Sequence, residues 1–136
     1  LLTRMRFRPT VEGEGSAFYR VMRPQGVALP MISMAARLRV DPAGTVVAAR
    51  VTVAPAGPVP CLSETAADTL VGSAAEHEVF DAAAQAALGA LSLRDSKYRA
   101  SRAYREDMVR THLPRVLAVA AERAAGARIE PWGEGK

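Results

Sequence analysis

The most restrictive feature of the sequence is a pair of alternating segments separated by a tight turn. Over residues 31–40, apolar side chains alternate with small, polar or basic ones. The apolar members are Ile32, Met34, Ala36, Leu38 and Val40. A period of two is typical of a strand with one buried face. Asp-Pro-Ala-Gly at 41–44 supplies a turn, and residues 45–53 return with a similar pattern. The two segments therefore predict an antiparallel hairpin with one apolar face.

The rest of the chain predicts one strand before the hairpin and helices after it. Residues 16–22 are rich in aromatic and β-branched types, as in strands. Three helices are expected, at 63–71 with Ser63 as cap, at 76–91, and from 101 to just before Gly126. Strands followed by helices predict an α+β fold: a two-layer domain with an antiparallel sheet of about three to four strands and helices on one face.

The last helix has an amphipathic pattern with many arginines, and Pro114 within it predicts a kink. Residues three and four positions apart share a helix face. The apolar stripe is expected to contain Tyr104, Met108, Val109, Leu113, Val116, Leu117 and Ala120. The arginines expected largely outside it are Arg102, Arg105, Arg110 and Arg123. Tyr104 and Met108 are therefore expected to anchor the helix on the sheet.

Length and charge limit the class of protein. The chain has 136 residues, enough for one domain, and a net charge of +4. Residues 51–93 contain five acids and no Lys or Arg, so an acidic and a basic surface are expected. A basic surface suits nucleic acid, a phosphate-bearing ligand or an acidic protein. Glu106 and Asp107 interrupt the arginines of the last helix, which argues against nucleic acid as a partner. No segment predicts a membrane span.

No catalytic or metal-binding constellation is evident. His77 lies among acids at a helix start and is interpreted as a surface residue. His112 has no second ligand three or four residues away and is interpreted as a hydrogen-bonded core or interface residue. Cys61, the single cysteine, excludes an internal disulfide and is interpreted as an inert small hydrophobe. The GxG at 13–15 is flanked by carboxylates that repel phosphate, so residues 10–15 are interpreted as a flexible connector.

Three stretches together resemble the C-terminal domain of the FAD-binding medium subunit of the carbon monoxide dehydrogenase and xanthine dehydrogenase group of molybdenum hydroxylases. The first is LLTRMRFRP followed by SAFYRVMR. The second is PMISMAARLRVDPAGTVVAARVTVAPAGPVP, an alanine- and valine-rich hairpin with its Pro-x-Pro loop. The third is SRAYREDMVRTHLPRVL, similar to the family's Ser-Ala-x-Tyr-Arg-Arg helix. The resemblance extends from Leu1 to about Arg123.

The resemblance implies a division of the chain and a set of flavin neighbours. Residues 1–15 would be the closing strand and linker of an upstream flavin domain, 16–126 the C-terminal α+β domain, and 127–136 a tail. By position, Leu1 and Tyr19 match flavin neighbours of the family. Arg20 and Arg23 belong to the mobile loop that would lie near the flavin ring. The family's phosphate-binding glycine motifs lie in the upstream domain.

The resemblance also implies cofactors and partners. FAD is expected in the full-length subunit and not in this isolated chain, which would be inactive as an enzyme by itself. The expected partners are the upstream FAD-binding domain, a molybdopterin large subunit and an iron-sulfur small subunit, in the cytoplasm. The residues leave open two other classes of protein: a basic nucleic-acid-binding module and a cofactor-free docking or dimerisation domain.

Overall fold

Four antiparallel strands form one sheet in the part of the chain that the structure describes. The structure is a computed structural model and describes residues 1–23 and 29–127. The strands are β1 (Glu14–Met22), β2 (Pro30–Val40), β3 (Val46–Ala54) and β4 (Cys61–Leu62). They neighbour one another in chain order, and β2 and β3 are the predicted hairpin. The prediction of three to four strands is confirmed.

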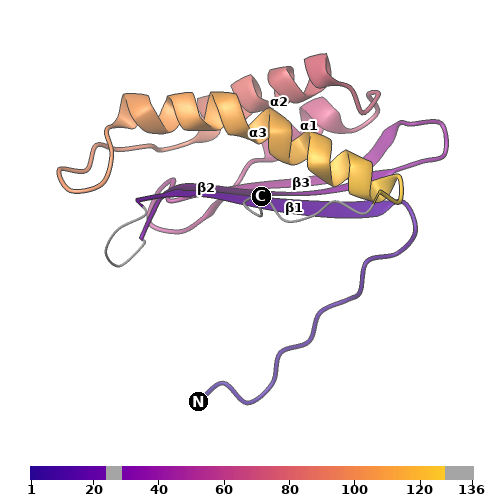
Figure 1. Cartoon of the computed structure of the whole chain (residues 1–136), viewed down its shortest axis with the longest axis horizontal. Helices are drawn as coiled ribbons and strands as arrows, with labels where there is room; N and C mark the ends of the chain where they lie inside the picture. Colours follow the sequence, from indigo (N-terminus) through magenta and orange to yellow (C-terminus); the bar gives the residue numbers. More distant parts are fainter. Residues whose placement is uncertain (24–28, 128–136) are drawn as a thin grey trace, which may run out of the picture.

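The helices cover one face of this sheet. They are α1 (Glu64–Leu70), α2 (His77–Ala90) and α3 (Arg102–Ala124). Figure 1 shows all three on the same side, with residues 1–10 leaving the sheet on the opposite side. The predicted two-layer α+β fold is therefore confirmed, with one helix-covered face and one open face.

The helix ends follow the capping residues expected from the sequence. The Ser63 hydroxyl accepts a hydrogen bond from Ala66 N at 3.3 Å, and that of Ser101 accepts one from Tyr104 N at 3.2 Å. Pro114 lies inside α3. In Figure 1 the axis of α3 changes direction along its length, as expected of a helix that a proline interrupts.

The core lies between α3 and the central strands. The alternation of β2 has the predicted phase, because Ile32, Met34 and Leu38 are fully buried. Leu113 and Leu117 of α3 are also fully buried in this core. Burying a side chain of this size contributes about 1.5–3 kcal/mol. The helix layer and the sheet are thus joined by close apolar packing.

β1 and α3 approach each other at Gly15. A Cβ at this position would lie 2.0 Å from the Ala120 carbonyl oxygen and 2.4 Å from the Ala124 nitrogen. Both are backbone atoms, so no side-chain rotation could make room for it. The absence of a side chain at Gly15 therefore allows the two backbones to come together.

The predicted flexible connector at residues 10–15 is wrong for residues 13–15. β1 already begins at Glu14, whose side chain is 3% exposed, and Gly13 adopts a positive φ of 76°. The Gly13 carbonyl accepts a hydrogen bond from Val40 N at 2.8 Å. Gly13 and Gly15 thus allow a turn and a close backbone contact, and this structural role accounts for the GxG pattern without a bound phosphate.

Residues 1–10 contain no strand in the structure and are exposed. A strand needs a neighbour for its backbone hydrogen bonds, and the described residues provide none there. The closing strand at the start of the chain therefore stays a prediction about a longer polypeptide. The predicted tail at 127–136 lies outside the described residues apart from residue 127.

The inward face of α3 differs from the prediction in its first turns. Tyr104 is 38% exposed and Met108 is only partly buried, whereas Arg105 is 2% exposed. Arg105 precedes Val109 by four residues and Leu113 by eight, and so shares their phase. The expectation that Arg105 lies outside the stripe is wrong, and so is the expectation that Tyr104 is a buried anchor.

Candidate functional site

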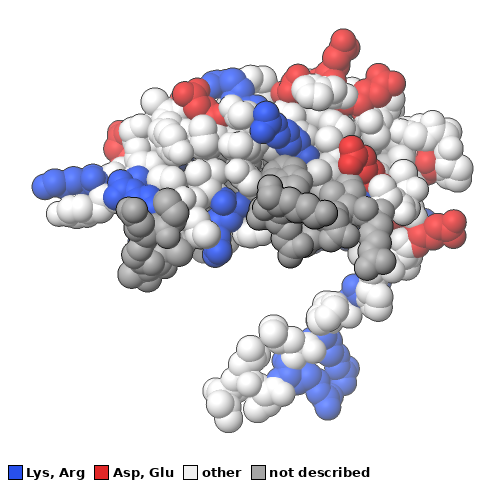
Figure 2. Space-filling view, viewed as in Figure 1, with Lys and Arg blue, Asp and Glu red and all other residues white. Residues whose placement is uncertain are grey.

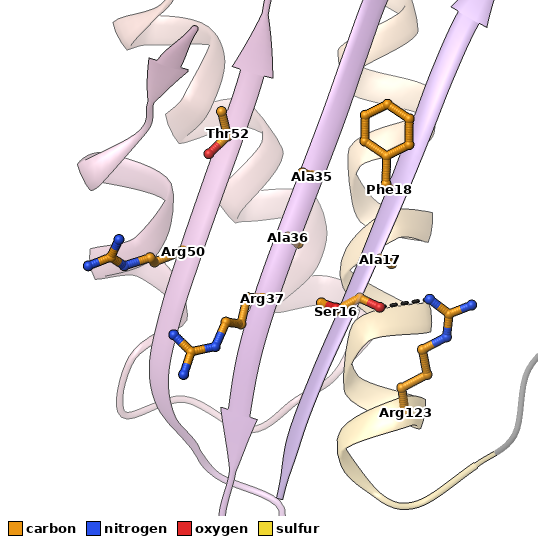
Figure 3. A pocket seen from close by; sticks show the side chains of 9 residues that line it. All are labelled: Ser16, Ala17, Phe18, Ala35, Ala36, Arg37, Arg50, Thr52 and Arg123. Atoms are coloured by element: carbon orange, nitrogen blue, oxygen red, sulfur yellow. Dashed lines mark hydrogen bonds between the residues drawn. The ribbon is translucent and has the colours of Figure 1, made fainter. Parts of the chain in front are cut away.

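The open face of the sheet includes the outward face of β1, the strand in which Tyr19 and Arg20 were predicted to be flavin neighbours. The register places Ser16, Arg37 and Arg50 in one row, and Phe18, Ala35 and Thr52 in the next. These side chains line a shallow groove of about 380 Å³ together with Arg123. Figure 3 shows the two central arginines on neighbouring strands and Phe18 at the other end of the groove.

Phe18 is an exposed large hydrophobic side chain in this groove. It is 63% exposed, although aromatic residues usually bury most of their surface. Arg20 lies two residues further along β1 and therefore on the same face of the strand as Phe18. An exposed aromatic ring beside guanidinium groups is suited to contact with a planar or acidic partner.

Arg123 reaches the same groove from the end of α3. Its Nη1 donates a hydrogen bond to the Ser16 carbonyl oxygen at 2.7 Å (Figure 3). The bond connects the helix layer to the first strand around the sheet edge. The predicted placement of Arg123 outside the apolar stripe is confirmed.

Glu14 sets the electrostatics at one end of the open face. Nη2 of Arg8 donates to its Oε1 at 2.7 Å, and Arg37 donates to the same oxygen. The Arg8 hydrogen bond lowers the pKa of Glu14, burial opposes it, and Arg37 and Val11 N lower it further, so that the pKa falls from 4.5 to about 2. The carboxylate therefore stays charged and links the N-terminal segment to β2.

The lowered pKa predicts a pH-dependent contribution to stability. With a folded pKa below the unfolded one, Glu14 stabilises the domain above about pH 4.5, and this stabilisation is lost as the pH falls toward 2. Glu14→Gln should lower the free energy of unfolding at pH 7 and flatten its decline in that window. Urea denaturation of both proteins between pH 2 and 7 measures this. Glu12→Gln, at an exposed site, is the control; equal pH dependence of wild type and Glu14→Gln would contradict the prediction.

The structure does not bring the four predicted flavin neighbours together. Leu1 is fully exposed at the far end of the N-terminal segment, distant from the sheet in Figure 1. Tyr19 is half-buried on the helix-facing side of β1, whereas Arg20 and Arg23 are exposed. Most of the loop expected near the flavin, residues 24–28, lies outside the described residues. Sequence reasoning missed Phe18, whose adjacency to Tyr19 made the strand phase ambiguous.

Tyr19 packs on His112 of α3 instead of facing the open side. The ring centroids are 4.5 Å apart, with planes tilted by 36°. Burial lowers the pKa of His112, and Arg115 lowers it further. Its Nδ1 is buried and has no hydrogen-bond partner in the described part of the chain, so the expected hydrogen-bonded role is wrong for this atom. His112 is half-buried between α3 and β1, and a role at an interface stays a prediction.

Neither a metal site nor a membrane span is formed by the residues that the structure describes. In residues 1–23 and 29–127, no three histidine, cysteine or acidic side chains are grouped as metal ligands. None of the helices described there combines the length and hydrophobicity that crossing a bilayer requires. Cys61 is a free, partly exposed cysteine in β4.

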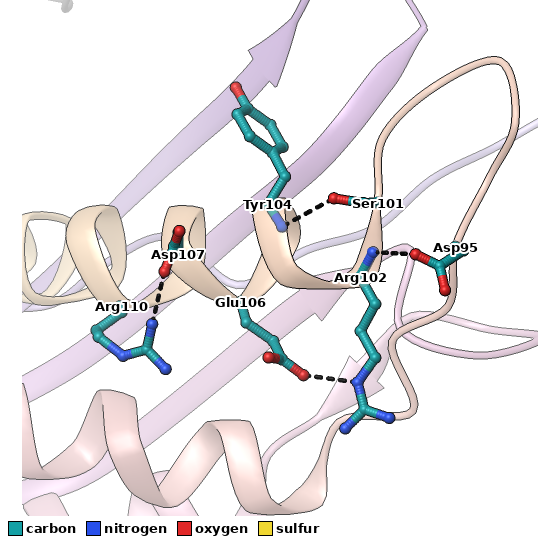
Figure 4. A network of polar contacts seen from close by, with 7 residues as sticks. All are labelled: Asp95, Ser101, Arg102, Tyr104, Glu106, Asp107 and Arg110. Atoms are coloured by element: carbon teal, nitrogen blue, oxygen red, sulfur yellow. Dashed lines mark hydrogen bonds and ion pairs between the residues drawn. The ribbon is translucent and has the colours of Figure 1, made fainter.

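Ion pairs along α3 neutralise much of its predicted basic face. Arg102 Nε donates to Glu106 at 2.6 Å, and Arg110 Nη1 donates to Asp107 at 2.8 Å (Figure 4). Both pairs are on the helix surface, where exposed ion pairs contribute little to stability. Figure 2 shows acidic and basic side chains interspersed on the helix layer, and further basic ones on the N-terminal segment. A continuous basic track, as a nucleic-acid backbone would need, is not visible on this face of the helix layer.

This sheet, open on one face and covered by three helices on the other, defines a class of two-layer α+β domain, and comparison with known proteins identifies the family. Residues 17–120 match the model of the CO dehydrogenase flavoprotein C-terminal domain. The chain belongs to this family, as the three sequence stretches predicted. No curated protein sequence matches the chain.

Solved structures of the same fold come from several enzymes. Carbon monoxide dehydrogenase from Hydrogenophaga pseudoflava superposes with a TM-score of 0.74 at 24% identity, over 84% of this chain and 39% of that chain. Quinoline 2-oxidoreductase from Pseudomonas putida 86 superposes with a TM-score of 0.72 at 26% identity, over 82% of this chain and 38% of that chain. CO dehydrogenase from Oligotropha carboxidovorans gives the same values. The chain thus spans about two fifths of the length of the chains that it matches.

Proposed function

We propose that this domain is the C-terminal part of the flavin subunit of a molybdenum hydroxylase, and that the open face of its sheet lies against the FAD-binding part of that subunit. The observation that carries the proposal is the asymmetry of the sheet. One face is covered by helices, whereas the other leaves Phe18 63% exposed in a groove that also contains Arg37 and Arg50. The family match and the similar solved structures support this assignment.

The described residues fit the ring of FAD better than its phosphates. A diphosphate needs a loop of free backbone amides, but in the glycine-containing turn the Glu14 nitrogen already donates to the Val11 carbonyl at 3.0 Å. On the open face, Phe18 and Arg20 could contact the rim of a flavin ring. Tyr19, on the helix-facing side of β1, would not touch the flavin and would support this strand through its contact with His112. Leu1 and Arg23 stay predictions as flavin neighbours.

In the proposed assembly this domain has a docking and shielding role. When bound, FAD would carry electrons between the iron-sulfur clusters of a small subunit and an acceptor, and the molybdopterin would belong to a large subunit. The open face of this domain would exclude water from one side of the flavin and hold the upstream domain in place. We propose a cytoplasmic assembly and no catalytic activity for the isolated domain.

The isolated chain should not bind FAD. It keeps at most the rim of the ring site, so titration with FAD should give no saturable quenching of flavin fluorescence at micromolar concentration. A longer polypeptide that includes the residues encoded upstream should purify with flavin. Tight stoichiometric binding to the isolated chain would contradict the prediction, and a longer polypeptide without flavin would contradict the proposed function.

Phe18→Ala in that longer polypeptide should weaken flavin retention. Removing an aromatic side chain that is buried against the flavin domain should raise the dissociation constant of FAD about tenfold, equivalent to about 1.4 kcal/mol. The matched control is Val71→Ala, since Val71 is also an exposed hydrophobic residue but lies at the end of α1. Equal flavin retention in both variants would show that the open face does not contact the flavin domain.

A further inference from the structure

Arg105 has an almost fully buried side chain for which the described chain provides no ion-pair partner, and of its guanidinium nitrogens only Nε is fully buried without a hydrogen bond. It lies in the first turn of α3 on the same helix face as Val109 and Leu113, and is 2% exposed. Its Nε is buried without a hydrogen-bond partner. No hydrogen bond or ion pair joins its side chain to another described residue. A long polar side chain therefore occupies a core-facing position without forming the contacts that normally offset its burial.

Such an arrangement is costly in a free domain. Burying an unpaired charge is strongly unfavourable, and buried arginines are normally paired. Burial lowers the pKa of Arg105, and the nearby Arg99 and Arg94 lower it further. Asp95 acts in the opposite direction, but its Oδ1 already accepts a hydrogen bond from Arg102 N at 2.8 Å. The start of α3 thus has an excess of positive charge around a desolvated guanidinium.

The surface around Arg105 has the composition of a protein-binding hot spot. We define the α3 entry patch as Arg94, Tyr98, Arg99, Tyr104 and Arg105. Tyr98 is highly exposed on the loop before α3, and Tyr104 is exposed on the first turn. In Figure 4 the ring of Tyr104 points away from the Arg102–Glu106 pair. Arginine and tyrosine are enriched in hot spots, where a desolvated centre is surrounded by side chains that exclude water.

We infer that the α3 entry patch docks a protein partner that places an aspartate or glutamate carboxylate against Arg105, between apolar side chains that cover Tyr98 and Tyr104. A carboxylate supplies the missing counter-ion and matches the planar guanidinium group. Nucleic acid fits less well, because the next arginines along α3, Arg102 and Arg110, are already paired within the helix. The partner is therefore an acidic, partly apolar protein surface, and the inference does not depend on flavin.

A pair of peptides tests this inference on the chain itself. The probes are acetyl-Leu-Glu-Leu-amide and its isosteric control acetyl-Leu-Gln-Leu-amide, titrated into ¹⁵N-labelled protein while the arginine Nε–H resonances are recorded. The glutamate peptide should shift the Arg105 resonance with a dissociation constant of about 1 mM, as for a minimal fragment of an interface. The glutamine peptide should not, because it has no charge.

Two variants and one anion complete the experiment. Arg105→Met should abolish the response to the glutamate peptide, whereas Arg102→Met, at an exposed and paired position, should retain it. No shift up to about ten times that concentration would overturn the proposal. Inorganic phosphate binding at least tenfold more tightly than the peptide would also overturn it, since the patch would then be a phosphate site.

Stability of the free chain provides an independent measurement. Because methionine replaces an uncompensated buried charge with an apolar side chain of similar length, Arg105→Met should keep or raise the urea midpoint. Arg105→Lys retains the charge and should not raise it. A clear fall in the midpoint of Arg105→Met would show that the guanidinium is compensated within the chain, and the docking role would be rejected.

Discussion

Gly15→Ala should destabilise the domain by about 3 kcal/mol or more, at the upper end of the usual cost of overpacking. The new Cβ would lie 2.0 Å from the Ala120 carbonyl oxygen and 2.4 Å from the Ala124 nitrogen. Both obstacles are backbone atoms of α3, so the strand and the helix would have to separate. Urea denaturation measures the loss, and the NMR spectrum of the variant would show whether the change spreads along β1.

Gly89→Ala is the matched control. Gly89 lies in α2, and a Cβ there would meet no atom within 4 Å. Alanine is the better helix former, so this variant should gain about 0.5–1 kcal/mol. If Gly15→Ala were as well tolerated as Gly89→Ala, the close approach of β1 and α3 would be disproved.

Leu113→Ala should cost about 2–5 kcal/mol, the usual range for a leucine removed from a core. Leu113 is fully buried between α3 and the sheet, next to the kink at Pro114. The cavity would be enclosed by strand and helix residues that cannot easily collapse into it. Such a loss is a large part of the roughly 5–15 kcal/mol that stabilises a domain.

Tyr104→Ala is the informative comparison for Leu113→Ala. Tyr104 is 38% exposed, so its truncation should cost about 1 kcal/mol or less. Both values come from urea denaturation at the same pH. A loss for Tyr104→Ala as large as that for Leu113→Ala would restore Tyr104 as a core anchor and would contradict the helix face assigned in the structure.

Much of the fold was predictable because local signals agreed with tertiary packing. The alternation of β2 and β3, the turn between them and the caps at Ser63 and Ser101 all act over a few residues. The order of these elements then limits the possible architectures to a small number. Sequence patterns therefore predicted the layers, the number of strands and the number of helices.

The first turns of α3 were mispredicted because residue type and helix phase gave different answers there. Tyr104 and Arg105 are adjacent, and hydrophobicity favoured burying the tyrosine. The spacing to Val109 and Leu113 instead places the arginine inward. An arginine four and eight residues before buried positions was the available signal. It conflicts with the average preference of arginine for the surface, and such conflicts often occur at functional positions.

The candidate site was less predictable than the fold. Phe18 and Tyr19 are consecutive aromatic residues, so the β1 sequence alone does not show which of them faces the helices. The structure resolves the choice through Gly15, which must lie under α3 and therefore places Ala17 and Tyr19 on the helix side. Leu1 and Arg23 stay predictions as flavin neighbours, because no local pattern determines what surrounds them.

The link between Arg8, Glu14 and Arg37 also determines where any polypeptide joined to residue 1 would be held. The chain leaves the sheet on the side opposite the helices (Figure 1), and Glu14 fixes the direction of departure. Ten extended residues reach at most about 35 Å. A domain tethered in this way would sample the open face at an effective concentration in the millimolar range, so even a weak contact there would be largely occupied. Glu14→Gln would loosen the tether and would also release Arg37, which lines the groove on the face itself.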